Sequence, residues 1–168
     1  MNRIINLLES DFNNHTILLI RIMTGAIFLS EGIQKFLFPA MRGAGRFAKM
    51  GFADPHFFAS FVAVFEIVCG ILLLTGLLTR GAAIIMLINI SVAIIVTKIP
   101  ILIGQNLGPF IVRELKIYGF WSTAHEIRTD LAMWLGCLFL IINGSGGMSV
   151  DRRLYNQIET KSEKGATN

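Results

Sequence analysis

Residues 57–78 read FFASFVAVFEIVCGILLLTGLL, an apolar run with one charged side chain, Glu66. A membrane-spanning helix needs about 20 consecutive apolar residues, so this run is long enough to cross a bilayer. A charge near the middle of such a helix costs about 2.5–3.5 kcal/mol on insertion scales, and it therefore needs a partner inside the protein. The run predicts a helical, membrane-embedded fold and makes Glu66 a candidate functional residue.

The rest of the chain has the same apolar character. Of its 168 residues, 54% are apolar and 15% are charged, whereas soluble domains carry about 25% charged residues. This composition argues against a soluble globule, a disordered chain, a disulfide scaffold and a nucleic-acid module. The basic residues beside the last apolar run, Arg152 and Arg153, suit anionic lipid headgroups. We expect Cys69 and Cys137, which lie in apolar runs, to act as small hydrophobic residues.

The apolar runs predict an all-α fold, a membrane four-helix bundle in one domain over residues 1–150. We expect spans at about 16–38, 57–78, 81–99 and 123–143, and a polar, flexible tail at 151–168. Thr79-Arg80-Gly81 predicts a tight turn between the second and third spans, and Pro100 predicts the end of the third. Thr123-x-x-Glu126 has capping-box spacing at the start of the fourth span, which Gly144 is expected to end.

Two segments are expected at the membrane surface. Residues 1–14 are polar, and the run after them is too long for the apolar part of a cleaved signal peptide. Residues 100–122 mix apolar side chains with charges and glycines, which predicts an interfacial or re-entrant segment with Tyr118 and Trp121 at headgroup level. Four spans place both termini on one side. The Lys and Arg counts alone do not decide which side this is, but they lean slightly toward the cytoplasm once Lys35, Lys98 and Arg128 are set aside as members of a buried cluster.

Charged residues within the spans are predicted to gather at one depth. Helix rise places Glu31 and Asp130 about 10 Å, and Glu66 about 13 Å, from the same membrane surface. Glu31 and Lys35 share a helix face, as do Glu126 and Asp130; the second pair is like-charged and therefore raises proton affinity unless a cation lies nearby. Arg21 lies far from this level, and we expect it to reach toward the surface nearest the N-terminus.

The candidates for ligand binding or proton relay are Glu31, Lys35, Glu66 and Asp130, with Asn89, Lys98, His125, Glu126 and Arg128 in support. Two interpretations stay open for this polar cluster. In the first, it is a set of interhelical ion pairs with a purely structural role. In the second, it binds a polar headgroup or relays protons. His125 and His56 are expected to be hydrogen-bonded residues at the rim. We find no phosphate-binding loop, nucleophile elbow or metal-ligand motif in the sequence.

Three motifs in order resemble the DoxX family of small four-helix bacterial membrane proteins. They are Arg21-Ile22-x-x-Gly25-x-x-Phe28-Leu29-x-x-Gly32-x-x-Lys35, Glu66-x-x-x-Gly70-x-Leu72-Leu73-Leu74-x-Gly76-Leu77-Leu78-Thr79-Arg80 and Gly144-x-Gly146-x-x-Ser149-Val150-Asp151. Ser145 departs from the family pattern, in which a proline is common at this place. The resemblance implies a plasma-membrane protein with four spans and cytoplasmic termini, associated with redox systems, in which some relatives serve quinone-reducing complexes or soluble redox enzymes.

Two functional hypotheses follow, and neither assigns a reaction to the chain. The first is an accessory membrane subunit of a redox system that binds a quinone-like headgroup or a soluble redox partner. Lys35 or Lys98 would then donate to the quinone carbonyls, and Glu66 or Asp130 would deliver protons. The alternative is a small proton-coupled carrier or permeation module, acting as a homo-oligomer because four helices enclose little volume.

Overall fold

A computed structural model describes residues 15–166 of the chain, with side chains described as far as Ile158. Within this range all regular elements are helical. They are α2 (Ile17–Leu37), α3 (Ala44–Lys49), α4 (Pro55–Thr75), α5 (Thr79–Ile103), α6 (Phe120–Glu126), α7 (Arg128–Asn143) and α8 (Val150–Ala166). The predicted all-α fold is confirmed for this part of the chain, whereas the expectation for residues 1–14 lies outside the described residues.

Three of the described helices, α2, α4 and α5, are long and apolar enough to cross a membrane. The predicted fourth span is divided between α6 and α7, with Ile127 between them. α7 has 16 residues, fewer than the roughly 20 that a straight crossing needs. The membrane character of the fold is therefore confirmed, and the last apolar helix is shorter than predicted.

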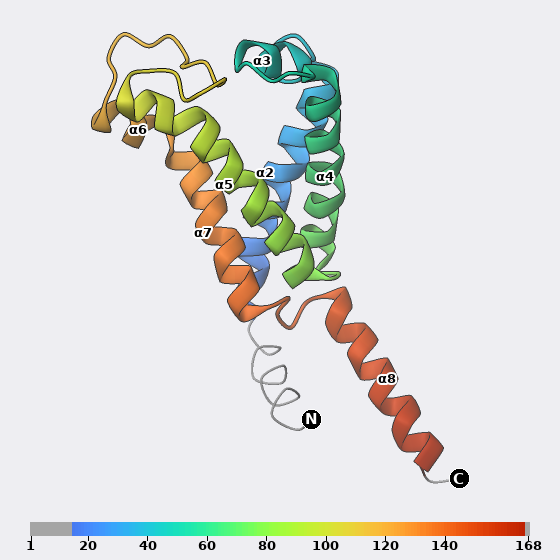
Figure 1. The fold of residues 1–168 in the computed structure, drawn as a ribbon. Helices are drawn as coiled ribbons and strands as arrows, with labels where there is room; N and C mark the ends of the chain where they lie inside the picture. The colour runs from blue at the N-terminus through green and yellow to red at the C-terminus, as the bar shows by residue number, and fades with distance from the viewer. Residues whose placement is uncertain (1–14, 167–168) are drawn as a thin grey trace.

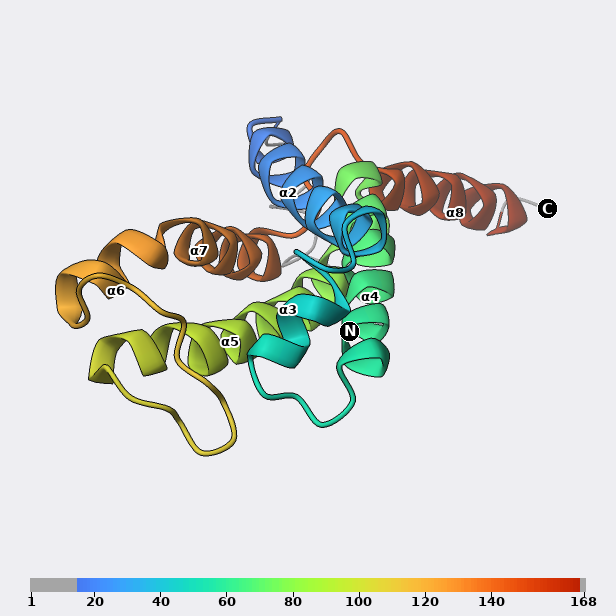
Figure 2. The same cartoon turned by 90° about the horizontal axis from the view of Figure 1, so that it is seen from above.

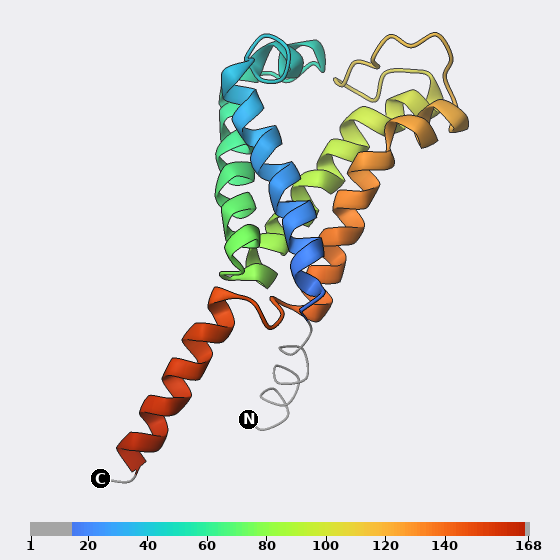
Figure 3. The same ribbon diagram turned by 180° about the vertical axis from the view of Figure 1, so that it is seen from behind.

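The long helices form two packed pairs, α2 with α4 and α5 with α7, joined by contacts of α4 with α5 and of α2 with α7 (Figure 1). The pairs lie closest where α5 begins and α7 ends, and they diverge toward the end that carries α3 and α6 (Figure 3). Seen from above, α2 and α4 lie on one side and α5 and α7 on the other (Figure 2). We call the two ends the α8 end and the α3 end.

Small residues bring α2 and α4 together. A Cβ atom added at Gly32 would lie 2.8 Å from the Ala63 carbonyl oxygen, and one at Gly70 would lie 2.8 Å from the Leu29 nitrogen. No side chain therefore fits between the backbones at these two places. Close approach of this kind is a common source of helix association in membranes, where apolar burial supplies little driving force.

The turn between α4 and α5 lies three residues earlier than predicted. Gly76 takes a left-handed conformation with φ of 71° and ends α4, so that α5 begins at Thr79. The Asp151 carboxylate accepts hydrogen bonds from the backbone nitrogens of Leu78 at 2.8 Å and Thr79 at 3.3 Å. A carboxylate from the far end of the chain thus caps the N-terminus of α5, and no local sequence pattern indicates it.

The predicted boundaries at Pro100 and Thr123 are also wrong. Pro100 lies inside α5, which continues to Ile103. A proline costs the helix one hydrogen bond and crowds the carbonyl four residues before it, but the following turn still closes, since the Gly104 nitrogen donates to the Pro100 carbonyl. Thr123 lies inside α6, and its hydroxyl donates to the Gly119 carbonyl at 3.1 Å instead of capping a helix. Gly144 ends α7, as predicted.

Residues 104–119 form an irregular segment at the α3 end. The Ile111 nitrogen donates to the Met50 carbonyl at 3.2 Å, and the Phe110 and Phe52 rings have centroids 5.3 Å apart. The segment therefore bridges from α5 to the α3–α4 connection. At the α8 end, the polar tail, for which no helix is predicted, is helical over Val150–Ala166 and extends away from the bundle (Figure 1).

Arg21 is buried, with 1% of its surface exposed, and does not reach toward the membrane surface as predicted. Its guanidinium donates to the carbonyls of Leu73 at 2.9 Å and Leu74 at 2.8 Å near the end of α4. It also donates to Ser145 at 2.9 Å and Met148 at 2.7 Å after α7. The fixed fork of N–H donors suits several convergent carbonyls, and Arg21 thus ties three parts of the chain together.

We predict that Arg21→Met destabilises the protein by about 3 kcal/mol or more, because it leaves several buried carbonyls without donors. Gly76→Ala should also destabilise the protein. The added Cβ atom would overlap the Arg21 guanidinium, and the backbone at residue 76 has a left-handed φ. Thermal unfolding in detergent micelles measures both. Exposed Arg46→Met is the control, expected within about 0.5 kcal/mol of the wild type, and equal effects of the two arginine variants would contradict this role.

Candidate functional site

Lys35 and Glu66 form an ion pair between α2 and α4. The Lys35 Nζ atom lies 2.5 Å from Glu66 Oε2, and their side chains are 10% and 8% exposed. Glu66 lies close to the middle of α4, far from both helix ends. Inside a bilayer each charge is costly alone, so the pairing explains how both can be retained. The predicted buried charge on α4 therefore has its partner on α2.

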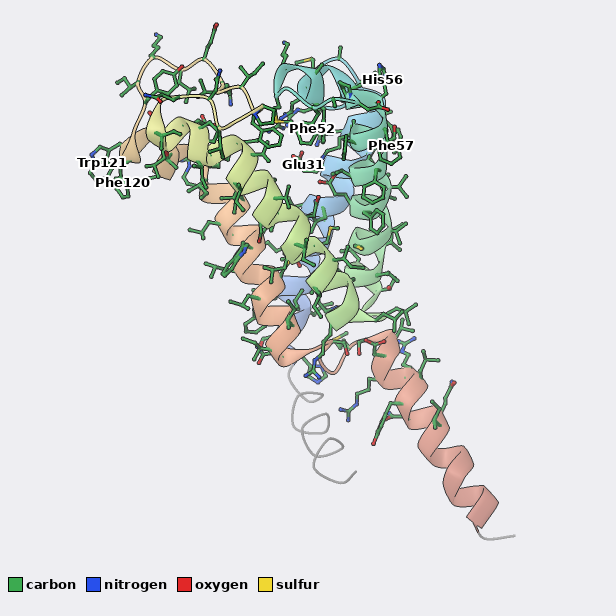
Figure 4. All side chains as sticks on the ribbon, in the orientation of Figure 1. Glu31, Phe52, His56, Phe57, Phe120 and Trp121 are labelled. Carbon is green, nitrogen blue, oxygen red and sulfur yellow. The ribbon has the colours of Figure 1, made fainter. Side chains whose placement is uncertain are left out.

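Two further groups complete this cluster. Asn89 of α5 donates from Nδ2 to Glu66 Oε1 at 3.4 Å, so both carboxylate oxygens have a partner. Glu31 lies one helical turn before Lys35, with its Oε2 3.9 Å from Nζ, and its Oε1 is 3.8 Å from the Arg42 guanidinium. Glu31 is nearer the α3 end, below α3 in the view of Figure 4. Side chains from three long helices thus meet, and the predicted grouping of Glu31, Lys35, Glu66 and Asn89 is found.

Asp130 does not join this group. Its Oδ2 lies 3.1 Å from Lys98 Nζ, which forms a separate ion pair between α7 and α5. Asn89 and Lys98 are about 13 Å apart along α5, so the two pairs lie at different depths. The predicted single level of polar groups is wrong: Asp130, in the first turn of α7, pairs with Lys98 nearer the α3 end, where the two helix pairs diverge (Figure 3).

The remaining predicted residues lie around α6. Glu126 pairs with Arg113 at 3.2 Å, and Arg128 donates to the His125 carbonyl at 2.7 Å. The like-charged residues Glu126 and Asp130 each have a cation beside them, Arg113 and Lys98, so the expected compensation of this pair is found; the two residues end α6 and begin α7. His125 is hydrogen-bonded at the rim, as predicted.

A small pocket of about 90 Å³ lies at the α3 end, beside the ion pair. Its wall consists of Lys35, Phe36, Pro39, Ala44, His56, Ala59 and Ser60. His56 lies at the start of α4 near α3 (Figure 4). Lys35 belongs both to this wall and to the buried pair, so the pocket and the cluster meet at this residue. Sequence reasoning missed Pro39, Ala44 and Ser60, because only the packing of α3 brings them together.

Other groups in the interior are structural. Cys69 and Cys137 are free and buried, as expected of small hydrophobic residues. The Trp134 indole donates to the Ser91 hydroxyl at 3.0 Å, and Ser91 donates to its own helix, so this pair joins α7 to α5. Among the described residues, no group of three or more His, Cys, Asp or Glu side chains is placed to hold a metal ion.

Apolar spanning helices joined by buried ion pairs define the chain as a small all-α integral membrane protein. A family model described as DoxX matches residues 16–99, which include the Lys35–Glu66 pair and Asn89. The chain belongs to the DoxX family.

The chain is similar to a known membrane protein. The uncharacterized membrane protein Rv3486 of Mycobacterium tuberculosis (strain ATCC 25618 / H37Rv) is 48% identical over 139 residues, which cover 83% of this chain and 81% of the relative. No solved structure matches the chain.

We predict that Lys35→Met lowers the free energy of unfolding by about 3–5 kcal/mol, because it leaves the Glu66 charge buried without its cation. The double variant Lys35→Met/Glu66→Met should recover most of this loss. Unfolding in micelles measures the four members of the cycle. Arg113→Met, which opens the exposed pair with Glu126, is the control and should cost no more than about 1 kcal/mol; additive losses from Lys35 and Glu66 would contradict a direct pair.

Proposed function

We propose that this chain is an accessory subunit of a quinone-linked redox system in the plasma membrane, and that its Lys35–Glu66 pair takes the carbonyl end of a quinone-like headgroup. The main support for this proposal is that Lys35 has two neighbours. Its side chain borders the pocket, and its Nζ atom lies 2.5 Å from the buried carboxylate of Glu66. A cation and a proton-exchanging carboxylate beside an apolar pocket are the groups that a quinone headgroup requires.

The pocket residues fit one edge of such a ring. Phe36, Pro39, Ala44 and Ala59 are apolar, while Lys35, His56 and Ser60 supply hydrogen-bond donors. A volume of about 90 Å³ suits the carbonyl edge, with the remainder of the ring and its tail among the apolar side chains of α4 that face the lipid. The exposed row Phe57, Phe61 and Phe65, with stacked or tilted neighbouring rings, provides that surface.

The roles of this chain's residues follow from their contacts. Lys35 donates to the carbonyl oxygen, Glu66 exchanges a proton at its carboxylate, and Asn89 holds the carboxylate from α5. A bound quinone supplies an acceptor that takes up electrons together with protons. The proposal assigns the electrons to a soluble redox partner, in keeping with what the family resemblance implies.

We also propose how the chain crosses the membrane. α7 is the fourth crossing of a four-helix bundle, continued to the surface by α6, and residues 104–119 form the interfacial or re-entrant segment before it. Trp121 at the outer side of α6 is strongly exposed (Figure 4), as suits a residue at headgroup level. Both termini then lie in the cytoplasm, with a flexible polar tail and room for a second copy of the chain at the lipid-facing surface.

The alternative of a proton-coupled carrier needs a connected path between titratable groups. In the described part of the chain, no hydrogen bond or ion pair links the Lys35–Glu66 pair to the Lys98–Asp130 pair. Between them on α5, Ser91 and Thr97 donate to carbonyls of their own helix. The geometry therefore favours binding at one pair over relay between the two.

The test is binding of decylubiquinone to the purified full chain in micelles, followed as the rise in unfolding temperature. We expect a rise for the wild type, because a ligand at 100 times its Kd stabilises by about 2.7 kcal/mol. Glu66→Gln should weaken binding about 10- to 100-fold, the effect of losing a charged hydrogen-bond partner. Asp130→Asn, at the other buried pair, is the matched control and should bind as the wild type does.

Absence of a shift in the wild type, or an unchanged shift in Glu66→Gln, would refute the proposal. The same variants in vesicles that contain a pH-sensitive dye address the carrier. Quinone-independent proton uptake by the wild type that disappears in Glu66→Gln would favour the carrier over the redox subunit. Loss of stability alone, without any effect on binding or flux, would leave the pair a purely structural one and would also contradict the proposal.

A further inference from the structure

α3 and the turn before it carry a strongly basic face, called here the basic face of α3. Arg42, Arg46 and Lys49 are exposed, and the sequence has no acidic residue between Glu31 and Asp54. Phe47 is the buried residue of the helix, and at about 100° per residue Arg46 and Lys49 lie on the side away from it. Within the described part of the chain neither has an ion-pair partner. The two cations are therefore available to an external anion.

The position of this face is set by tight backbone packing. A Cβ atom at Gly43 would overlap the carbonyl oxygen of Lys35, and one at Gly45 would overlap the carbonyl oxygen of Ala40. The backbone that precedes and begins α3 thus rests directly on the end of α2. The cations are presented by a short helix docked on the bundle and not by an extended loop.

Exposed apolar side chains adjoin the basic face. Leu37, Phe38 and Met41 end α2 and enter the turn before α3, and Met41 is 76% exposed. They continue the lipid-facing surface of a spanning helix, whereas α3 lies just beyond the end of α2 and α4 (Figure 1). At a membrane surface the acyl chains lie below the charged headgroups. The apolar side chains at the end of α2 and the cations beyond them have the same arrangement.

We propose that the basic face of α3, formed by Arg42, Arg46 and Lys49, binds the phosphate groups of anionic phospholipids. Leu37, Phe38 and Met41 insert among the upper acyl chains below it. Arg42 joins the face although its guanidinium is 3.8 Å from Glu31, because 45% of its side chain stays exposed. An acidic protein partner fits less well, since it would have to cover an apolar row that is continuous with the membrane surface.

Native mass spectrometry of the full chain in micelles tests this inference, with dioleoylphosphatidylglycerol and dioleoylphosphatidylcholine added in equal amounts. We expect the wild type to prefer phosphatidylglycerol. Arg46→Gln/Lys49→Gln should reduce that preference about 30-fold, the factor for two cations near an anionic surface. The charge-preserving Arg46→Lys/Lys49→Arg is the matched control and should keep it.

The wild type provides an independent measurement that needs no variant. Raising the salt from about 0.05 M to about 0.5 M should reduce the preference strongly, because exposed charges are screened over a few ångströms at high salt. Equal binding of the two lipids, or equal preference in the neutral and charge-preserving variants, would overturn the inference. So would displacement of phosphatidylglycerol by soluble glycerol phosphate at the same concentration, which would show a site for free phosphate.

Discussion

A charge in the hydrocarbon interior must have a partner, and this requirement organises the protein. Glu66 lies near the middle of an apolar helix, and the Lys35 amine of α2 forms an ion pair with it at 2.5 Å. Because these helices also approach closely at Gly32 and Gly70, apolar packing and charge pairing hold the same two elements in one register. Lys98 and Asp130 do the same for α5 and α7 at 3.1 Å. The two helix pairs are thus each joined by an ion pair.

The α8 end satisfies the same requirement with backbone groups. Arg21 places one guanidinium among carbonyls at the end of α4 and after α7, where helix termini leave carbonyls without partners. Asp151 supplies the opposite charge to the nitrogens at the start of α5. One end of the bundle is therefore held together by buried hydrogen bonds, while the α3 end holds the pocket and the basic face. Both proposed binding sites lie at the α3 end, away from these hydrogen bonds.

Much of the architecture could be predicted because apolar run length and buried charge are local properties of the sequence. The three long helices and the partnership of Lys35 with the acidic residues follow from them. The partners of Arg21 and the cap from Asp151 could not be predicted, since they join segments far apart in the chain. The position of Asp130 was predicted wrongly because helix rise along one helix does not show how two helix pairs diverge (Figure 3): Asp130 pairs with Lys98 of α5 and does not reach Glu66.

The central claim is that Lys35 and Glu66 are in direct contact within the membrane. Solid-state NMR of the full chain in lipid bilayers tests it through the dipolar coupling between the Lys35 side-chain nitrogen and the carboxyl carbons of individual acidic residues. We expect a strong coupling to Glu66, as the 2.5 Å separation of nitrogen and oxygen requires, and none to Asp130. A coupling of Lys35 to Asp130, or no coupling to Glu66, would contradict it.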